Sequence, residues 1–173
     1  LPKGTKVTFS ELDPAPLPGM DFGLPFYYVV VDATDEPGDR DLVEVEADEI
    51  AEVQIRNRPI PTTDVVVDKI VTGLKGSDVM NDDNALFQVT ASWTDIDGFE
   101  KVCVLNVVPG EAAVPTADCN ATVLDGKVQF PLNTEITFNE TGARTDVSNV
   151  KWSEVIWTVT GGDADLEAVE GSK

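Results

Sequence analysis

The sequence has no histidine, and it contains 12 lysine and arginine residues against 32 aspartate and glutamate residues, a net charge of −20. Without histidine, neither a Ser-His-Asp triad nor a histidine metal site can form. Nucleic acids and anionic membrane surfaces select basic proteins, so neither is expected as a partner. No apolar run approaches the roughly 20 residues of a membrane-spanning helix. We therefore expect no membrane insertion.

Other signals of catalysis are missing as well. The chain has no G-x-S-x-G nucleophile elbow and no glycine-rich phosphate loop. A paired-carboxylate glycosidase mechanism is all that the composition leaves open, and with 32 acidic residues such pairs arise by chance. We expect no enzyme activity and no cofactor.

Cysteine is scarce, with Cys103 and Cys119 as the two examples. Cys103 lies in the strand-like run KVCVLNVV, and Cys119 follows a turn-rich stretch, so a hairpin can bring them together. In an oxidising compartment they are expected to form a disulfide, and in a reducing compartment two buried thiols. Two cysteines without histidine cannot supply the four ligands of a structural zinc site.

What the sequence does contain is an internal repeat. LPKGTKVTFSE returns as FPLNTEITFNE at a constant offset of 129 residues. Two further pairs follow in the same order, so the chain is expected to be an array of modules. The three matched pairs are 1–11 with 130–140, FYYVVV at 26–31 with VIWTVT at 155–160, and GDRDLVEVE at 38–46 with GDADLEAVE at 162–170.

The repeat predicts two modules. Residues 1–61 form the C-terminal part of one, and residues 62–173 form the next, which lacks its last strand because the segment 49–61 has no second copy. The boundary is expected in RNRPIPTTD, residues 56–64. Two prolines there disfavour a central strand and favour an extended linker.

Alternation of apolar and polar residues predicts strands throughout, as in the runs 6–9, 51–56 and 87–93. Clusters rich in Gly, Pro, Asn and Asp separate these runs. No segment shows a sustained helical pattern, apart from a short possibility near residues 48–52. Many short strands at this spacing predict an all-β chain built as a β-sandwich.

Every second residue of a strand points the same way, so four polar residues are predicted to lie on the apolar faces of their strands. Lys69 shares a face with three valines, Glu11 and Glu140 each extend an apolar pair, and Asn57 follows Val53 and Ile55 in parity. A buried lysine or glutamate is costly without a partner. The pattern therefore suggests that these side chains meet in a core.

These motifs resemble the Cna protein B-type, immunoglobulin-like modules of Gram-positive and actinobacterial adhesins and pilins. Lys69 in VVVDKIVTG matches the first-strand lysine of that family, Glu140 in TEITFNETG and Glu11 in TKVTFSELDP match its glutamate, and Asn57 in AEVQIRNRP matches its last-strand asparagine. The resemblance implies immunoglobulin-like sandwich modules in tandem. It also implies that these residues are candidates for self-crosslinking by a Lys–Asn isopeptide bond.

The resemblance implies a structural stalk module of a bacterial cell-surface adhesin or pilus-like protein, extracellular and attached to the cell wall. Its partners are neighbouring modules of the same protein and, through other domains, a host surface ligand. Neither predicted module holds a complete triad. Three alternatives stay open: the missing strands lie outside this sequence, Asn57 of one chain complements another chain by strand exchange, or Asn57 reaches Lys69 across the linker.

The alternative function is a ligand-binding β-sandwich adhesion domain, specific for carbohydrate or dependent on calcium. Asp95, Asp97 and Glu100 in TDIDGFE are weak metal candidates, because their spacing departs from the twelve-residue calcium loop. The three tryptophans, Trp93, Trp152 and Trp157, suit a sugar-stacking platform, although alternating aromatics are more often core residues.

Overall fold

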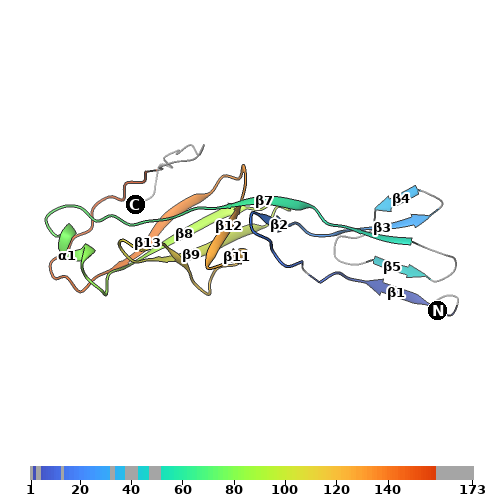
Figure 1. The fold of residues 1–173 in the computed structure, drawn as a ribbon, viewed down its shortest axis with the longest axis horizontal. Coiled ribbons are helices and arrows are strands. Elements are labelled where there is room, and N and C mark those ends of the chain that lie inside the picture. Colours follow the sequence, from blue (N-terminus) through green and yellow to red (C-terminus); the bar gives the residue numbers. More distant parts are fainter. Residues whose placement is uncertain are drawn as a thin grey trace. The chain divides into compact units, whose positions relative to one another are not determined.

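The computed structural model describes residues 2, 5–12, 14–31, 34–37, 43–46 and 52–158. Within these ranges nearly all regular structure is antiparallel β-strand, with one helix of five residues, so the expectation of an all-β chain is confirmed. The same ranges contain no helix with the length and hydropathy of a membrane span. The elements are β1 Lys6–Phe9, β2 Met20–Phe22, β3 Phe26–Val31, β4 Thr34–Pro37, β5 Val43–Glu46, β6 Glu52–Arg56, β7 Pro59–Asp64, α1 Gly76–Met80, β8 Leu86–Thr94, β9 Glu100–Val107, β10 Val114–Pro115, β11 Val123–Leu124, β12 Lys127–Pro131 and β13 Thr137–Arg144 (Figure 1).

The chain divides into two compact units that are each assembled from separate stretches of sequence. Unit 1 comprises Leu1–Val65, Thr94–Glu100 and Thr122–Thr134, and unit 2 comprises Val66–Trp93, Lys101–Ala121 and Glu135–Lys173. The assignment of residues 1–61 and 62–173 to two successive modules stays a prediction.

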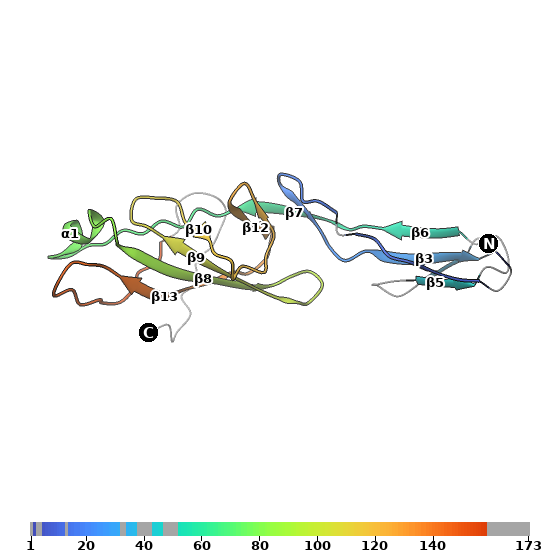
Figure 2. The same cartoon turned by 90° about the horizontal axis from the view of Figure 1, so that it is seen from below.

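Unit 1 contains three sheets, with strand orders β1-β5, β4-β3-β6 and β11-β12-β7-β2. The alternating run 6–9 forms β1, and residues 52–56 of the run 51–56 form β6, so both predicted strands are present among the described residues. Figure 2 shows β6 beside β3, and the register pairs Tyr27 with Ile55 and Phe26 with Arg56. Tyr27 is 1% exposed, so the start of β3 is at the core of its sheet. This pairing brings the end of β6, and Asn57 after it, to the beginning of β3.

Strand β7 stands where two prolines led us to expect an extended linker, so that expectation is wrong. Pro59 and Pro61 pair with β2, whereas the non-proline half of β7 pairs with β12. A proline lacks an N–H but keeps its carbonyl. The Pro61 carbonyl accepts a hydrogen bond from the Leu132 amide at 2.9 Å, and the adjacent Thr62 amide donates to the Gly19 carbonyl at 3.0 Å. The strand therefore loses only those bonds that its prolines cannot donate.

Unit 2 is built on the sheet β10-β9-β8-β13. The run 87–93, predicted as a strand, forms most of β8 and alternates as expected, with Phe87, Val89, Ala91 and Trp93 all buried. Each large apolar side chain that is fully buried contributes about 1.5–3 kcal/mol. Cys103 on β9 is completely buried and is joined by a disulfide to Cys119. This core face of β8 is the surface on which the candidate site lies.

Candidate functional site

The sheet register of unit 2 directs Glu140 toward the core. On β13, Glu140 pairs with Val89 and Phe138 pairs with Ala91. Directly paired residues of antiparallel strands point to the same face of the sheet. Val89 and Ala91 are at most 3% exposed, so the face that carries the Glu140 carboxyl group is the buried one. A repeated T-F-x-E motif thus places an acid among apolar side chains.

A β-bulge follows Glu140 directly. The register jumps from Glu140 opposite Val89 to Gly142 opposite Gln88, which leaves Thr141 as the extra residue. A Cβ atom at Gly142 would lie 3.3 Å from Oε1 of Gln88, so a side chain there would require Gln88 to move. Bulges redirect side chains next to functional sites. This bulge interrupts the regular pairing of β13 with β8 directly after Glu140.

Lys69 reaches the same face from the segment between β7 and α1. Its Nζ is hydrogen-bonded and ion-paired to Oε2 of Glu140. The same Nζ lies 4.7 Å from the centroid of the Phe87 ring, within the range of a cation–π interaction. The two side chains are 19% and 12% exposed, so the pair is largely withdrawn from water. An amine, a carboxyl group and an aromatic wall therefore share one partly buried site in unit 2.

Unit 1 holds the repeat-related glutamate in a different pairing. Oε1 of Glu11 accepts a hydrogen bond of 3.1 Å from Nδ2 of Asn57, the residue after β6. The Glu11 backbone amide donates to the Tyr27 hydroxyl at 2.7 Å. Glu11 follows β1 and Tyr27 belongs to β3, so β3 holds the backbone of Glu11 while the residue after β6 contacts its carboxylate. A carboxyl group and a carboxamide therefore meet in unit 1.

The second oxygen of that carboxylate has no partner among the described residues. Oε2 of Glu11 is buried and accepts no hydrogen bond there. A buried polar atom without a partner costs about 1–3 kcal/mol, and more when it is charged. Unit 1 therefore presents a carboxylate oxygen that a donor such as an ammonium group would satisfy, and unit 2 has such a donor on the equivalent glutamate.

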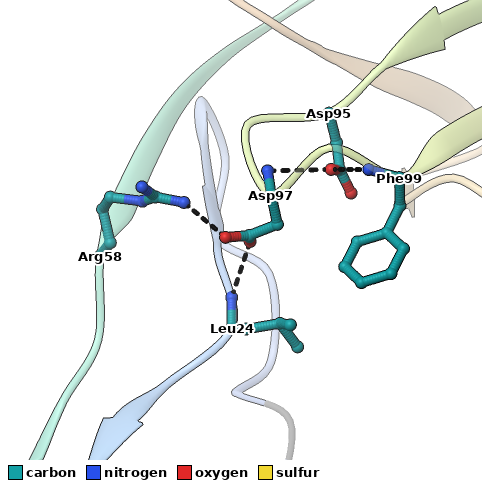
Figure 3. Close-up of polar contacts among 5 residues, drawn as sticks. All are labelled: Leu24, Arg58, Asp95, Asp97 and Phe99. Carbon is teal, nitrogen blue, oxygen red and sulfur yellow. Dashed lines mark hydrogen bonds and ion pairs between the residues drawn. The ribbon is translucent and has the colours of Figure 1, made fainter. Parts of the chain in front are cut away.

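Two of the three weak metal candidates in the TDIDGFE turn, Asp95 and Asp97, accept hydrogen bonds from the protein itself. Asp97 is 5% exposed, and its Oδ1 accepts a charged hydrogen bond of 2.7 Å from Arg58 while its Oδ2 accepts one of 3.0 Å from the Leu24 amide (Figure 3). Glu100 is exposed at the start of β9. Within the described ranges, no three Asp, Glu or Cys side chains are grouped as a metal site.

Asp95 organises the turn itself. Its Oδ1 accepts hydrogen bonds of 2.9 Å from the backbone amides of Asp97 and Phe99 (Figure 3). Gly98 takes φ = +87°, a left-handed conformation that glycine adopts without a Cβ penalty. The two aspartates therefore shape the loop and anchor it on Arg58.

The tryptophans pack within unit 2. Trp93 is 7% exposed, Trp152 meets the edge of Phe87 with ring centroids 5.3 Å apart, and Trp157 lies 6.3 Å from Phe138. Such edge and tilted contacts are typical of core aromatics. Trp93 is therefore withdrawn from any sugar-stacking platform, whereas Trp152 is 44% exposed despite its contact with Phe87.

Sequence parity identified Lys69, Glu140, Glu11 and Asn57 as a group, and the structure distributes them as two pairs, one in each unit. Parity did not identify Phe87 or Tyr27 as members of the sites, because parity says nothing of which strands lie together. Comparisons with protein-family models, with curated proteins and with solved structures find no match to this chain.

Proposed function

We propose that the chain is part of a structural stalk of a cell-surface adhesin or pilus-like protein. Its modules are immunoglobulin-like sandwiches in which a lysine on the first strand and an asparagine on the last become joined by an amide bond. One observation carries the proposal. The repeated glutamate contacts a carboxamide in unit 1, through Glu11 and Asn57, and an amine in unit 2, through Glu140 and Lys69.

The repeat makes the two pairs parts of one site. Glu11 and Glu140 occupy equivalent positions, 129 residues apart. A group that contacts one of them is therefore expected at the equivalent place on the other. Combined in this way, the pairs give amine, carboxyl group and carboxamide around a single glutamate, on an apolar background that includes Phe87.

The chemistry requires a neutral amine, because the ammonium form has no lone pair. The hydrogen bond between Lys69 and Glu140 provides the path for that proton, which passes from Nζ to the carboxylate. The neutral Nζ then attacks the asparagine Cγ, and the carboxyl group gives its proton to the departing side-chain nitrogen. The bond from Cγ to that nitrogen breaks, ammonia leaves, and the regenerated carboxylate takes the second proton of Nζ as the new amide forms.

Such a bond suits a stalk because it closes each module between its first and last strands. A module tied in this way cannot be unzipped by tension on its ends. The net charge of −20, the all-β architecture and the disulfide between Cys103 and Cys119 support an extracellular setting. Neighbouring modules of the same protein are its proposed partners.

The alternative function, a carbohydrate-binding or calcium-dependent adhesion domain, would use the carboxylates of the 95–100 turn or the tryptophans. Asp97 instead binds Arg58, and Trp93 is buried. Unit 1 also has a cavity of about 320 Å³, but its lining of prolines, aliphatic side chains and short polar side chains includes no aromatic ring on which a sugar stacks. The lining residues are Pro59, Ile60, Pro61, Thr94, Asp95, Ile96, Pro131, Leu132, Asn133 and Thr134.

The proposal is tested by giving unit 2 its own copy of the segment that carries Asn57. Residues 49–61 are appended after Lys173, and the intact mass is measured under denaturing, reducing conditions. We expect a mass lower than the sequence by one ammonia. Matched controls replace either Lys69 or the appended asparagine with alanine, and both should keep the full mass. A full mass in the unsubstituted protein, with the appended segment folded onto unit 2, would reject the crosslink.

A further inference from the structure

The segment between β7 and α1 carries Lys69, and its backbone is anchored on both sides of that residue. On one side, the Val67 carbonyl accepts a hydrogen bond of 3.3 Å from the Ala113 amide. On the other side, the Val71 amide donates a hydrogen bond to Sδ of Met80, also at 3.3 Å. Met80 is the last residue of α1, so a thioether ties the segment to that helix.

Helix α1 packs closely against the same residue of the segment. A Cβ atom added at Gly76 would lie 2.7 Å from the Val71 carbonyl oxygen, so a side chain there would force the two backbones apart. Val79 of the helix is completely buried. The N–H of Val71 therefore meets the Met80 sulfur, and its C=O meets Gly76. A contact packed this tightly has little room to adjust to an added atom.

The sulfur of Met80 is open to a chemical change that this contact cannot absorb. Met80 is half-buried, so part of its side chain is accessible to a small solute. A thioether is a weak hydrogen-bond acceptor, and it is also the group that oxidants convert to a sulfoxide. An N–H···O hydrogen bond by itself spans about 2.7–3.2 Å. The sulfoxide oxygen therefore cannot lie between Sδ and the Val71 nitrogen, which are 3.3 Å apart. If it points elsewhere, the amide faces a sulfur with a partial positive charge.

We propose that Met80 is an oxidative modification site, at which a peroxide converts the thioether to a sulfoxide and so releases the Val71 amide and the segment that carries Lys69. Sulfur gives an electron pair to one peroxide oxygen, and the O–O bond breaks. The proton of that oxygen goes to the departing hydroxide, which leaves as water. Sulfur is thus oxidised by two electrons and the peroxide is reduced by two. Enzymatic reduction of the sulfoxide restores the thioether.

This inference does not rest on the proposed function, because it concerns the anchor of the segment and not the chemistry of Lys69. Met20 provides a comparison within the chain. The sequence has two methionines, and Met20 lies on β2 in unit 1, where it is half-buried as Met80 is. Its hydrogen bonds with Leu17 are made by its backbone, which oxidation of the side chain leaves in place. A sulfoxide at Met20 is therefore expected to leave unit 2 unchanged.

The test treats the whole chain with hydrogen peroxide and locates the added oxygen by peptide mass spectrometry. Hydrogen exchange at the Val71 amide should become about tenfold faster. The unfolding equilibrium constant of unit 2, followed by tryptophan fluorescence in urea, should rise about five- to tenfold. The Met20→Leu chain should respond in the same way. Met80→Leu keeps the apolar volume and all three tryptophans but has no sulfur, so its Val71 amide should exchange fast before treatment and should not change with it.

Complete oxidation of Met80 with unchanged exchange at Val71 would overturn the proposal. An equal effect of peroxide on the Met80→Leu chain and on the unsubstituted chain would overturn it too, as would a Met80 that stays a thioether while Met20 is fully oxidised. Treatment of the oxidised chain with a methionine sulfoxide reductase should return both signals to their starting values. Signals that stay changed after Met80 is reduced would assign the effect to other groups and contradict the proposal.

Discussion

The contact between Lys69 and Glu140 should have a measurable energy in the folded protein. The perturbation is a double-mutant cycle made of Lys69→Met, Glu140→Gln and the double variant. Methionine keeps the length and apolar stem of lysine without its charge, and glutamine keeps the shape of glutamate. The cycle isolates the energy of the pair, since effects of either substitution on the surroundings cancel.

The expected coupling follows from burial and bonding. An ion pair on the surface contributes about 0.2–1 kcal/mol. The side chains of Lys69 and Glu140 are only 19% and 12% exposed, and a hydrogen bond joins them. Charge-assisted hydrogen bonds in such settings contribute about 1.5–3 kcal/mol. We therefore expect a coupling of about 2 kcal/mol. Lys69→Met alone should cost more than Glu140→Gln alone, because it leaves the Glu140 carboxylate with neither counter-ion nor donor from residue 69, whereas the glutamine still offers an oxygen that accepts a hydrogen bond from Nζ.

Urea unfolding followed by tryptophan fluorescence is the assay. All three tryptophans, Trp93, Trp152 and Trp157, belong to unit 2, so this signal reports the unit that contains the pair. A coupling below about 0.5 kcal/mol would place the pair with ordinary surface contacts. It would refute the reasoning that this is a partly buried, functionally placed site.

Three further predictions concern contacts outside that pair. Reduction of the disulfide between Cys103 and Cys119 should lower the unfolding free energy of unit 2 by about 3 kcal/mol, because the bond closes a loop of 16 residues; a loss below about 1 kcal/mol in urea titrations would contradict this. Asp97→Ala should destabilise unit 1 by about 2 kcal/mol, since it leaves Arg58 without its counter-ion. It should also speed hydrogen exchange at the Leu24 amide, because that amide loses its acceptor. Unchanged exchange at this amide would contradict the prediction. The Thr145 hydroxyl and nearby backbone amides donate hydrogen bonds to Asp82 and hold its pKa below the ordinary 3.8. The stabilisation that these hydrogen bonds give the folded protein is therefore present above that pH and is lost as the pH falls through the lowered pKa. Asp82→Asn should reduce the acid sensitivity of unfolding monitored by tryptophan fluorescence, and an identical pH profile would exclude this contact as a source of that sensitivity.

Alternation of apolar and polar residues identified three strands, although only β8 among them has the buried face that alternation predicts, since Phe9 of β1 and Ile55 of β6 are 39% and 43% exposed. Lys6–Phe9, Glu52–Arg56 and Leu86–Thr94 all form strands, because a period of two has a direct meaning on a pleated sheet. A different rule, that prolines disfavour a central strand, failed for β7, where it suggested a linker. A sheet tolerates proline where only its carbonyl is needed, and the sequence does not reveal which edge a neighbour occupies.

Helix α1 shows a second limit. Its five residues are too few for a helical period to appear in the sequence, so no helix was expected over Gly76–Met80. The short helical possibility near residues 48–52 falls mainly outside the described residues, and its residue 52 begins β6.

The candidate sites were predictable in composition but not in arrangement. Parity and the repeat together selected the two glutamates, Lys69 and Asn57. Which glutamate meets which partner depends on strand pairings far apart in sequence, such as that of Glu140 with Val89. The partnership of Arg58 with Asp97, 39 residues away, leaves no local signal at all. Contacts of this kind come from the sheet topology, which periodicity does not encode.

Mapping of the crosslink is the most direct test of the central claim, that a lysine, a glutamate and an asparagine of this chain form a self-crosslinking site. The protein extended by residues 49–61 is digested and analysed by tandem mass spectrometry. The predicted result is a branched peptide that joins Lys69 to the appended asparagine, one ammonia lighter than its two parts, and absent from the Glu140→Ala variant. An unbranched Lys69 peptide in the folded, extended protein would contradict the claim.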